Sequence, residues 1–201
     1  MNRLLRIAIA DDEPRMRDYL AQILQRLGHE VVSAALSGRE LIDHCLSFHP
    51  ELIITDIKMP DMDGIDATTE IYKHEAIPVI LVSAFHDPEL IHRATRNHIL
   101  AYLVKPIKDT DLQPAISIAM QRFDEFRSLH GQAADLKQAL EDRKVIERAK
   151  GILMKRANLD ESSAFRRLQK LASAKNRKLI DIAHVIVTAE EALQGIDGER
   201  R

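Results

Sequence analysis

Three aspartates in the first third of the chain have the chemistry to hold a cation and to accept a phosphoryl group. Asp11 and Asp12 directly follow one short apolar run, and Asp56 directly follows another. Carboxylates brought into one crevice repel each other unless a cation joins them, and their hard oxygen ligands suit Mg²⁺. A carboxylate held beside such an ion can attack a phosphoryl group in line and become an acyl phosphate.

Two further residues could support that reaction. The transition state of phosphoryl transfer spreads negative charge over three equatorial oxygens, so positive and hydroxyl donors should flank the aspartates. Lys105 and Ser83 each follow an apolar run of their own. We expect both side chains to contact the phosphoryl oxygens.

The apolar runs alternate with amphipathic segments, which predicts successive β-α units. Strands are expected at 5–10, 30–35, 52–55, 78–83 and 101–104, and helices at 15–27, 38–48, 65–74, 88–96 and from 109 onward. This alternation predicts an α/β fold with a doubly wound, five-stranded parallel sheet. Ligands of such folds bind at the carboxyl ends of the strands, which is where the residues named above fall.

These residues resemble the signature of the response-regulator receiver family. The matching motifs are Asp11-Asp12, Asp56-Ile-Lys-Met-Pro-Asp-Met-Asp-Gly, Ser83-Ala84 and Lys105-Pro106, and the resemblance covers roughly residues 4–122. It implies a flavodoxin-like fold with strand order 2-1-3-4-5 and a sensor histidine kinase as partner.

The same resemblance implies the phosphorylation and metal sites. Asp56 would be the phosphoacceptor. Asp12, Asp56 and the main-chain carbonyl of Lys58 would bind Mg²⁺, and Asp11 would help through a water molecule.

The remaining roles also come from the resemblance. Ser83 and Lys105 would hold the phosphoryl oxygens, and Tyr102 would be an aromatic switch residue that turns inward as Ser83 moves toward the phosphate. The Lys105–Pro106 peptide bond is expected to be cis.

A continuously helical pattern follows residue 107. Apolar residues recur at spacings of three and four in two sets, over 116–126 and 129–140, with one register shift between them. We expect a rigid connecting helix over 123–142 that pairs with a second copy of the chain as a homodimer. The alternative is a helix packed on its own domain.

Charged residues are distributed unevenly along the chain. Residues 143–178 contain 12 Lys+Arg against 3 Asp+Glu, a net charge of +9, so the remainder carries −11 of the total of −2. This asymmetry indicates an acidic module joined to one that meets a polyanion. Together with the receiver resemblance and the helical pattern, this predicts a receiver domain at 1–122, the connecting helix at 123–142 and a small three-helix domain at 143–201.

The basic segment resembles the ANTAR domain of AmiR- and NasR-type transcription antitermination regulators. The match rests on Ile146-Glu-Arg-Ala-Lys-Gly-Ile-Leu-Met154, on Ala164-Phe165 with Leu168, and on Asn176-Arg-Lys-Leu179 with Ala183. Ser173 departs from the pattern, which has methionine there. The resemblance implies binding to RNA stem-loops and control of transcription antitermination.

Eight basic residues of this segment are candidates for RNA contact, each with a solvated helix face as the alternative. They are Arg148, Lys150, Lys155, Arg156, Arg166, Lys170, Lys175 and Arg177. A basic surface attracts phosphates and makes affinity depend on salt. The spacing of Phe165 to Leu168 predicts that this aromatic ring lies in the core.

The expected mechanism is a population shift. Phosphorylation of Asp56 by a sensor kinase favours a state that binds RNA. Two alternatives remain open: a DNA-binding helix-turn-helix in place of the RNA-binding domain, and an aspartate-based phosphatase. The phosphatase motif needs a second aspartate where Lys58 stands, so we expect a regulator and not an enzyme.

The sequence also predicts a cytoplasmic protein without a membrane partner. Cys45 is a single cysteine, so no internal disulfide can form. No apolar run approaches the ~18–20 residues that span a bilayer.

Overall fold

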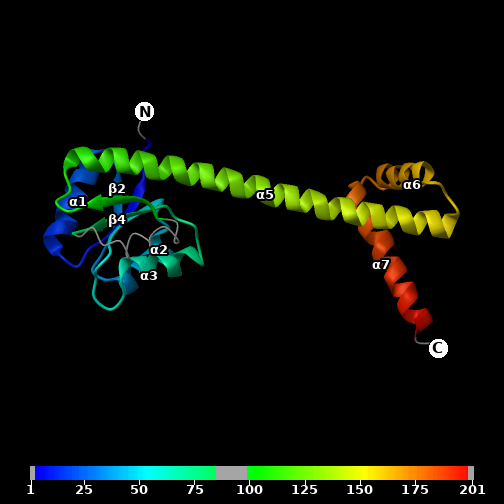
Figure 1. The fold of residues 1–201 in the computed structure, drawn as a ribbon, viewed down its shortest axis with the longest axis horizontal. Helices are drawn as coiled ribbons and strands as arrows, with labels where there is room; N and C mark the ends of the chain where they lie inside the picture. The colour runs from blue at the N-terminus through cyan, green and yellow to red at the C-terminus, as the bar shows by residue number, and fades with distance from the viewer. Residues whose placement is uncertain (1–2, 85–98, 199–201) are drawn as a thin grey trace. The chain divides into compact units, whose positions relative to one another are not determined.

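The structure, a computed structural model, describes residues 3–84 and 99–198, with side chains up to residue 192 (Figure 1). The chain forms two compact units, Met1–Arg127 and Ser128–Arg201. The helix expected at 88–96 lies outside the described residues.

The first unit is built on a five-stranded sheet. Its strands are β1 (Arg6–Ala10), β2 (Glu30–Ala35), β3 (Leu52–Asp56), β4 (Val79–Ser83) and β5 (Ile99–Val104). All neighbouring strands are parallel, and their order is β2-β1-β3-β4-β5. The predicted fold class and strand order are therefore confirmed.

Helices cover both faces of this sheet. They are α1 (Pro14–Arg26), α2 (Gly38–Phe48), α3 (Gly64–Tyr72) and the beginning of α5 (Asp109–Ala157). Side chains from α1 and α5 pack on one face, and side chains from α2 and α3 pack on the other. Because both faces of the sheet are covered, β3 is buried along its whole length. Its residues are accordingly all apolar except the last two, Thr55 and Asp56.

The second unit is a three-helix assembly. The end of α5 packs with α6 (Glu161–Ala174) and α7 (Leu179–Gly198) around a small apolar core. The buried members of that core are Ala149, Leu168, Ala172, Ile182, Ala183 and Val187. Asp160 caps α6, because its carboxylate accepts a hydrogen bond of 2.8 Å from the amide of Ser163.

Helix α5 has a different environment at each of its two apolar sets. Ile116, Ala119 and Phe123 are buried in the first unit, so this set packs on its own domain. The second set stays open, because Leu129, Leu136 and Leu140 are 65%, 67% and 60% exposed. Within the connecting helix expected at 123–142, Phe123 therefore packs on its own domain, and pairing of the exposed set with a second copy stays a prediction.

The length and hydropathy of the helices show whether any of them could cross a membrane. Helix α5 is 49 residues long but carries charged side chains throughout, and α7 has 20 residues. Within residues 3–84 and 99–198, no helix is both long enough and apolar enough to cross a membrane.

The packing around Gly64 generates a stability prediction. A Cβ at this position would lie 2.0 Å from the carbonyl oxygen of Asp56 and 2.9 Å from Thr55 Oγ1. Because the first of these atoms is backbone, it cannot rotate away. We expect Gly64→Ala to lower the free energy of unfolding by about 1–3 kcal/mol, measured by urea denaturation.

Gly131→Ala is the matched control. It lies inside α5, and its Cβ would meet no atom within 4 Å. Alanine is favoured over glycine in a helix interior by about 1 kcal/mol, so this variant should be at least as stable as the native chain. Equal stability of the two variants would contradict the packing described here.

Candidate functional site

The three predicted aspartates meet at one edge of the sheet. Asp11 and Asp12 follow β1, and Asp56 ends β3, which pairs directly with β1. One carboxylate oxygen from each lies within 4.8 Å of the others. Asp11 is 0% and Asp56 8% exposed, whereas Asp12 is exposed. A cluster of oxygen donors with one open side fits a hard cation such as Mg²⁺.

Lys105 supplies the positive charge that holds two of these carboxylates together. It follows β5, and its Nζ donates hydrogen bonds to Asp11 Oδ2 at 2.8 Å and to Asp56 Oδ2 at 2.6 Å. The Lys105–Pro106 peptide bond is cis, as expected. The amide of Lys105 donates to the carbonyl of Ser83 at 2.8 Å, which ties the ends of β4 and β5 together.

The protonation behaviour of this cluster follows from its burial. Burial raises the pKa of Asp11, although hydrogen bonds from Lys105 and from the amide of Glu13 work against that rise. Burial alone would lower the pKa of Lys105, but its hydrogen bonds to Asp11 and Asp56 outweigh it and the pKa lies above the ordinary value. Lys105 therefore stays protonated, and further positive charge beside Asp11 would be favourable.

Several contacts fix the backbone around Asp56. Thr55 Oγ1 donates to the carbonyl oxygen of Asp56 at 2.9 Å, and the amide of Lys58 donates to Asp56 Oδ1 at 3.3 Å. The amide of Gly64 closes the loop by donating to the carbonyl of Ile57 at 2.9 Å. Gly64 ends the Asp56 motif in the sequence, but the contacts of Thr55 and Gly64 could not be predicted from it, because they depend on where the loop returns to the strand.

Arg17 is another residue that the sequence did not reveal. Its Nη1 donates to the main-chain carbonyl of Asp11 at 2.6 Å and to that of Asp12 at 3.3 Å. This guanidinium group, on the first turns of α1, therefore holds the turn that carries both aspartates. In the sequence, Arg17 shows only that it lies in a predicted helix, and many surface arginines do so.

Ser83 and Tyr102 lie on the two neighbouring strands at this edge. Ser83 ends β4 and is buried, and Tyr102 on β5 is half-buried against the core on the side of α2 and α3. The β4–β5 register pairs Leu81 with Tyr102 and Ser83 with Val104, so Ser83 lies level with the end of β5 from which Lys105 follows. The switch role of Tyr102 and the metal contact of the Lys58 carbonyl remain predictions.

Seven of the eight predicted RNA-contacting residues are exposed on the second unit. These are Arg148, Lys155, Arg156, Arg166, Lys170, Lys175 and Arg177. Two of them form ion pairs with α7: Arg148 with Glu191 at 2.7 Å, and Arg156 with Glu190 at 3.0 and 3.2 Å. A polyanion binding at these two positions would compete with internal carboxylates.

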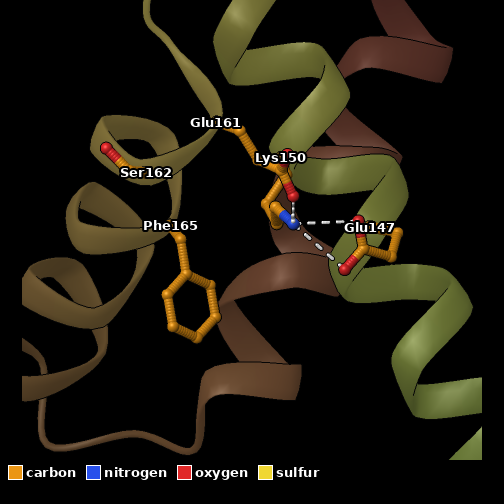
Figure 2. A pocket seen from close by; sticks show the side chains of 5 residues that line it. All are labelled: Glu147, Lys150, Glu161, Ser162 and Phe165. Carbon is orange, nitrogen blue, oxygen red and sulfur yellow. Dashed lines mark hydrogen bonds and ion pairs between the residues drawn. The ribbon is translucent and has the colours of Figure 1, made fainter.

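Lys150 differs from the other seven. It is only 7% exposed, and its Nζ donates to Glu147 at 2.9 and 3.1 Å and to Glu161 at 2.7 Å. These hydrogen bonds raise the pKa of Lys150, and the bond that Lys150 donates to Glu161 has the largest effect. The charge of Lys150 is balanced by Glu147 and Glu161 within the unit (Figure 2), so Lys150 does not extend the basic surface.

The prediction that Phe165 lies in the core is wrong. The residue is 36% exposed, while Ala164, Leu168 and Ala172 are buried. These three follow one another at spacings of four and define the buried stripe of α6. Phe165 lies beside that stripe and not in it, so its spacing of three residues to Leu168 did not mean that its ring is buried.

Comparison with known proteins identifies both units. Residues 7–117 match the response regulator receiver domain, and residues 134–187 match the ANTAR domain. The transcriptional regulatory protein PdtaR of Mycobacterium tuberculosis (strain H37Rv) is 39% identical over 182 residues, which are 90% of this chain and 89% of that protein.

Solved structures agree for the first unit. A response regulator receiver domain protein from Clostridium thermocellum shares 29% identity, with a TM-score of 0.56, over 61% of this chain and 99% of that chain. The chemotaxis protein CheY4 of Vibrio cholerae shares 22% identity, with a TM-score of 0.55, over 58% and 99%. The second similarity shows the fold alone.

The ion triad of Asp11, Asp56 and Lys105 makes a specific prediction for stability. Lys105→Met leaves two buried carboxylates facing each other, and we expect the free energy of unfolding at pH 7 in EDTA to fall by about 1–3 kcal/mol. Millimolar Mg²⁺ should restore part of the loss, because a divalent cation replaces the missing charge. Urea denaturation with and without Mg²⁺ measures both effects.

Lys108→Met is the control, since Lys108 is an exposed lysine three residues further along the same loop. It should leave stability in EDTA nearly unchanged. If Lys105→Met were as stable as Lys108→Met in EDTA, Lys105 would not be the group that holds the two aspartates together.

Proposed function

The chain belongs to the response regulators that join a receiver domain to an ANTAR domain, and from this premise we propose that phosphorylation of Asp56 controls RNA binding by the second unit. The two matched domains are regulatory. The observation that carries the proposal is the Lys105 ammonium group hydrogen-bonded to both Asp11 and Asp56.

In this proposal Asp56 is the nucleophile. One of its carboxylate oxygens bonds to phosphorus as the bond from phosphorus to an imidazole nitrogen of a sensor histidine kinase breaks. Asp56 lies at the carboxyl end of β3. The Thr55 hydroxyl donates to its main-chain carbonyl, and the amide of Lys58 donates to its carboxylate. A carboxylate in a fixed orientation needs little rearrangement before in-line attack, which favours this role.

The surrounding residues stabilise the added charge. Lys105 and the Ser83 hydroxyl hold the phosphoryl oxygens, because both belong to neighbouring strand ends at this edge. Asp11, Asp12, Asp56 and the Lys58 carbonyl would hold Mg²⁺, which would offset the negative charge of the phosphoryl group when bound. The cluster of three carboxylates, with one oxygen from each within 4.8 Å of the others, supports this assignment.

Tyr102 and Ser83 carry the signal away from the site. When Ser83 turns toward the phosphoryl group it vacates space, and the half-buried Tyr102 ring moves inward. This step acts only as a shift between two states, so the phosphoryl group must prefer one of them. The chain therefore works as a regulator and not as an enzyme with an external substrate.

The output is RNA binding by the exposed basic residues of the second unit, in line with antitermination control by the ANTAR family. We assign the contacts to Lys155, Arg166, Lys170, Lys175 and Arg177, and to Arg148 and Arg156 once their pairs with α7 open. The ANTAR match favours RNA over the duplex DNA of the helix-turn-helix alternative.

A homodimer through α5 completes the proposal. Leu129, Leu136 and Leu140 recur at spacings of seven and four and are each at least 60% exposed. Three large apolar side chains in one row favour pairing with the same row of a second copy.

The output assignment can be tested by binding. An RNA of two stem-loops should bind more tightly than duplex DNA of matched sequence at equal salt. Arg166→Ala/Lys170→Ala should weaken RNA binding about tenfold and reduce the slope of log affinity against log salt by about one to two, measured by fluorescence anisotropy.

Arg39→Ala/Lys108→Ala removes two exposed charges of the first unit and serves as the matched control. It should change neither affinity nor slope. Tighter binding of the duplex DNA would replace the RNA assignment with the helix-turn-helix alternative.

A further inference from the structure

The side chain of Arg17, near the start of α1, reaches back to the turn that carries two of the clustered aspartates. Its Nη1 donates to the main-chain carbonyl of Asp11 at 2.6 Å and to that of Asp12 at 3.3 Å. These two carbonyls belong to the peptide groups on either side of the Asp12 Cα. Because each peptide group is planar, holding both groups fixes the φ and ψ angles of Asp12. The guanidinium group therefore sets the direction in which the Asp12 side chain leaves the backbone.

Asp12 depends on this backbone contact more than the other two aspartates do. Asp11 is buried, and its carboxylate accepts hydrogen bonds from Lys105 at 2.8 Å and from the amide of Glu13 at 2.9 Å. Asp56 is also buried and accepts from Lys105 at 2.6 Å. The Asp12 side chain is exposed, and the two bonds from Lys105 go to the other carboxylates. The position of the Asp12 carboxylate thus follows from the backbone of the turn.

The two ends of the turn are anchored by main-chain hydrogen bonds. The amide of Asp11 donates to the carbonyl of Ala35 on β2 at 3.2 Å. At the other end, the carbonyl of Glu13 accepts from the amide of Arg17 at 3.2 Å, which begins α1. Between these anchors the carbonyls of Asp11 and Asp12 are held by a charged donor, and hydrogen bonds to a charged group are about twice as strong as neutral ones. Arg17 is therefore the side chain that fixes the middle of the turn.

We propose that Arg17 is a positioning residue for the metal site, which orients the Asp12 carboxylate toward the cation and so raises the affinity of the chain for Mg²⁺. Groups that hold metal ligands in place contribute about 10–100-fold to metal affinity. The inference assigns Arg17 no contact with the cation or with the phosphoryl group. It rests on the proposed function, because it takes Mg²⁺ to bind at the three aspartates.

The sign of the effect separates positioning from charge. A guanidinium group beside three carboxylates opposes the approach of a cation, so its charge alone weakens Mg²⁺ binding. If Arg17 acted only through its charge, Arg17→Ala would bind Mg²⁺ more tightly than the native chain. Positioning predicts the opposite result, a loss of affinity.

The dissociation constant for Mg²⁺ is measured on the full chain without phosphorylation. The stability of the folded chain is recorded by urea denaturation over a series of Mg²⁺ concentrations, since an ion that binds the folded chain stabilises it according to its concentration relative to Kd. Arg17→Ala should weaken Mg²⁺ binding about tenfold. Arg17→Lys, which keeps one cationic donor, should recover part of the loss.

Two matched variants control for charge and for loosening of α1. Arg15→Ala removes an exposed positive charge from the same turn of the helix and should not weaken Mg²⁺ binding. Tyr19→Phe removes the hydrogen bond of 2.9 Å that the Tyr19 hydroxyl donates to the carbonyl of Ile107, so it loosens α1 from a different loop. Its Mg²⁺ affinity should equal that of the native chain.

The rate of phosphorylation by acetyl phosphate gives a second readout, followed by intact mass spectrometry. Arg17→Ala should need about tenfold more Mg²⁺ for its half-maximal rate. Its rate at saturating Mg²⁺ should stay within about twofold of the native rate, because a residue that acts only on binding of the cation does not change the maximal rate.

The outcomes separate this inference from the proposed function. Native or tighter Mg²⁺ binding by Arg17→Ala would overturn the inference alone, and so would an equal loss of affinity in Tyr19→Phe. A native chain whose stability and phosphorylation do not respond to Mg²⁺ would overturn the proposed metal site and the inference together.

Discussion

The ammonium group of Lys105, held between the carboxylates of Asp11 and Asp56, is the interaction on which the receiver unit depends. Each carboxylate is buried, and a buried charge is costly unless it is paired and hydrogen-bonded. The strand order places β1 beside β3 and brings the residue after β5 to the same edge. The fold thus concentrates negative charge and supplies one internal cation, which leaves the cluster suited to a second cation and to a phosphoryl group.

The connection to the output runs through a single element. Helix α5 begins four residues after Lys105 and contributes Leu112 and Ile116 to the core of the first unit. The same helix contributes Ala149 to the core of the second unit and carries Lys150, which pairs with Glu147 and Glu161. A change in the packing of its first turns therefore reaches the output unit through continuous backbone. The signal needs two states of this helix and a phosphoryl group that prefers one of them.

Much of the first unit could be predicted from the sequence, because parallel strands buried on both faces leave a direct pattern. The bounds of β2 and α2 were predicted to the residue, and the reactive side chains were located at the ends of strands. The second unit was less predictable. Lys150 pairs with Glu161 across a turn, and Arg156 pairs with Glu190 on another helix, so their availability depends on tertiary contacts. The burial of Phe165 was predicted wrongly, because periodicity indicates which face of a helix is buried but not how many neighbouring positions on that face are covered.

Control of RNA binding by Asp56 is tested most directly by the RNA affinity of the full chain before and after phosphorylation by acetyl phosphate with Mg²⁺. Fluorescence anisotropy with one selected stem-loop RNA gives both dissociation constants, and Asp56→Asn treated identically is the reference. Phosphorylation should tighten RNA binding of the native chain about tenfold, a coupling of ~1.4 kcal/mol, and should have no effect on Asp56→Asn. Equal affinities of the phosphorylated and unphosphorylated native chain would contradict the control of RNA binding by Asp56.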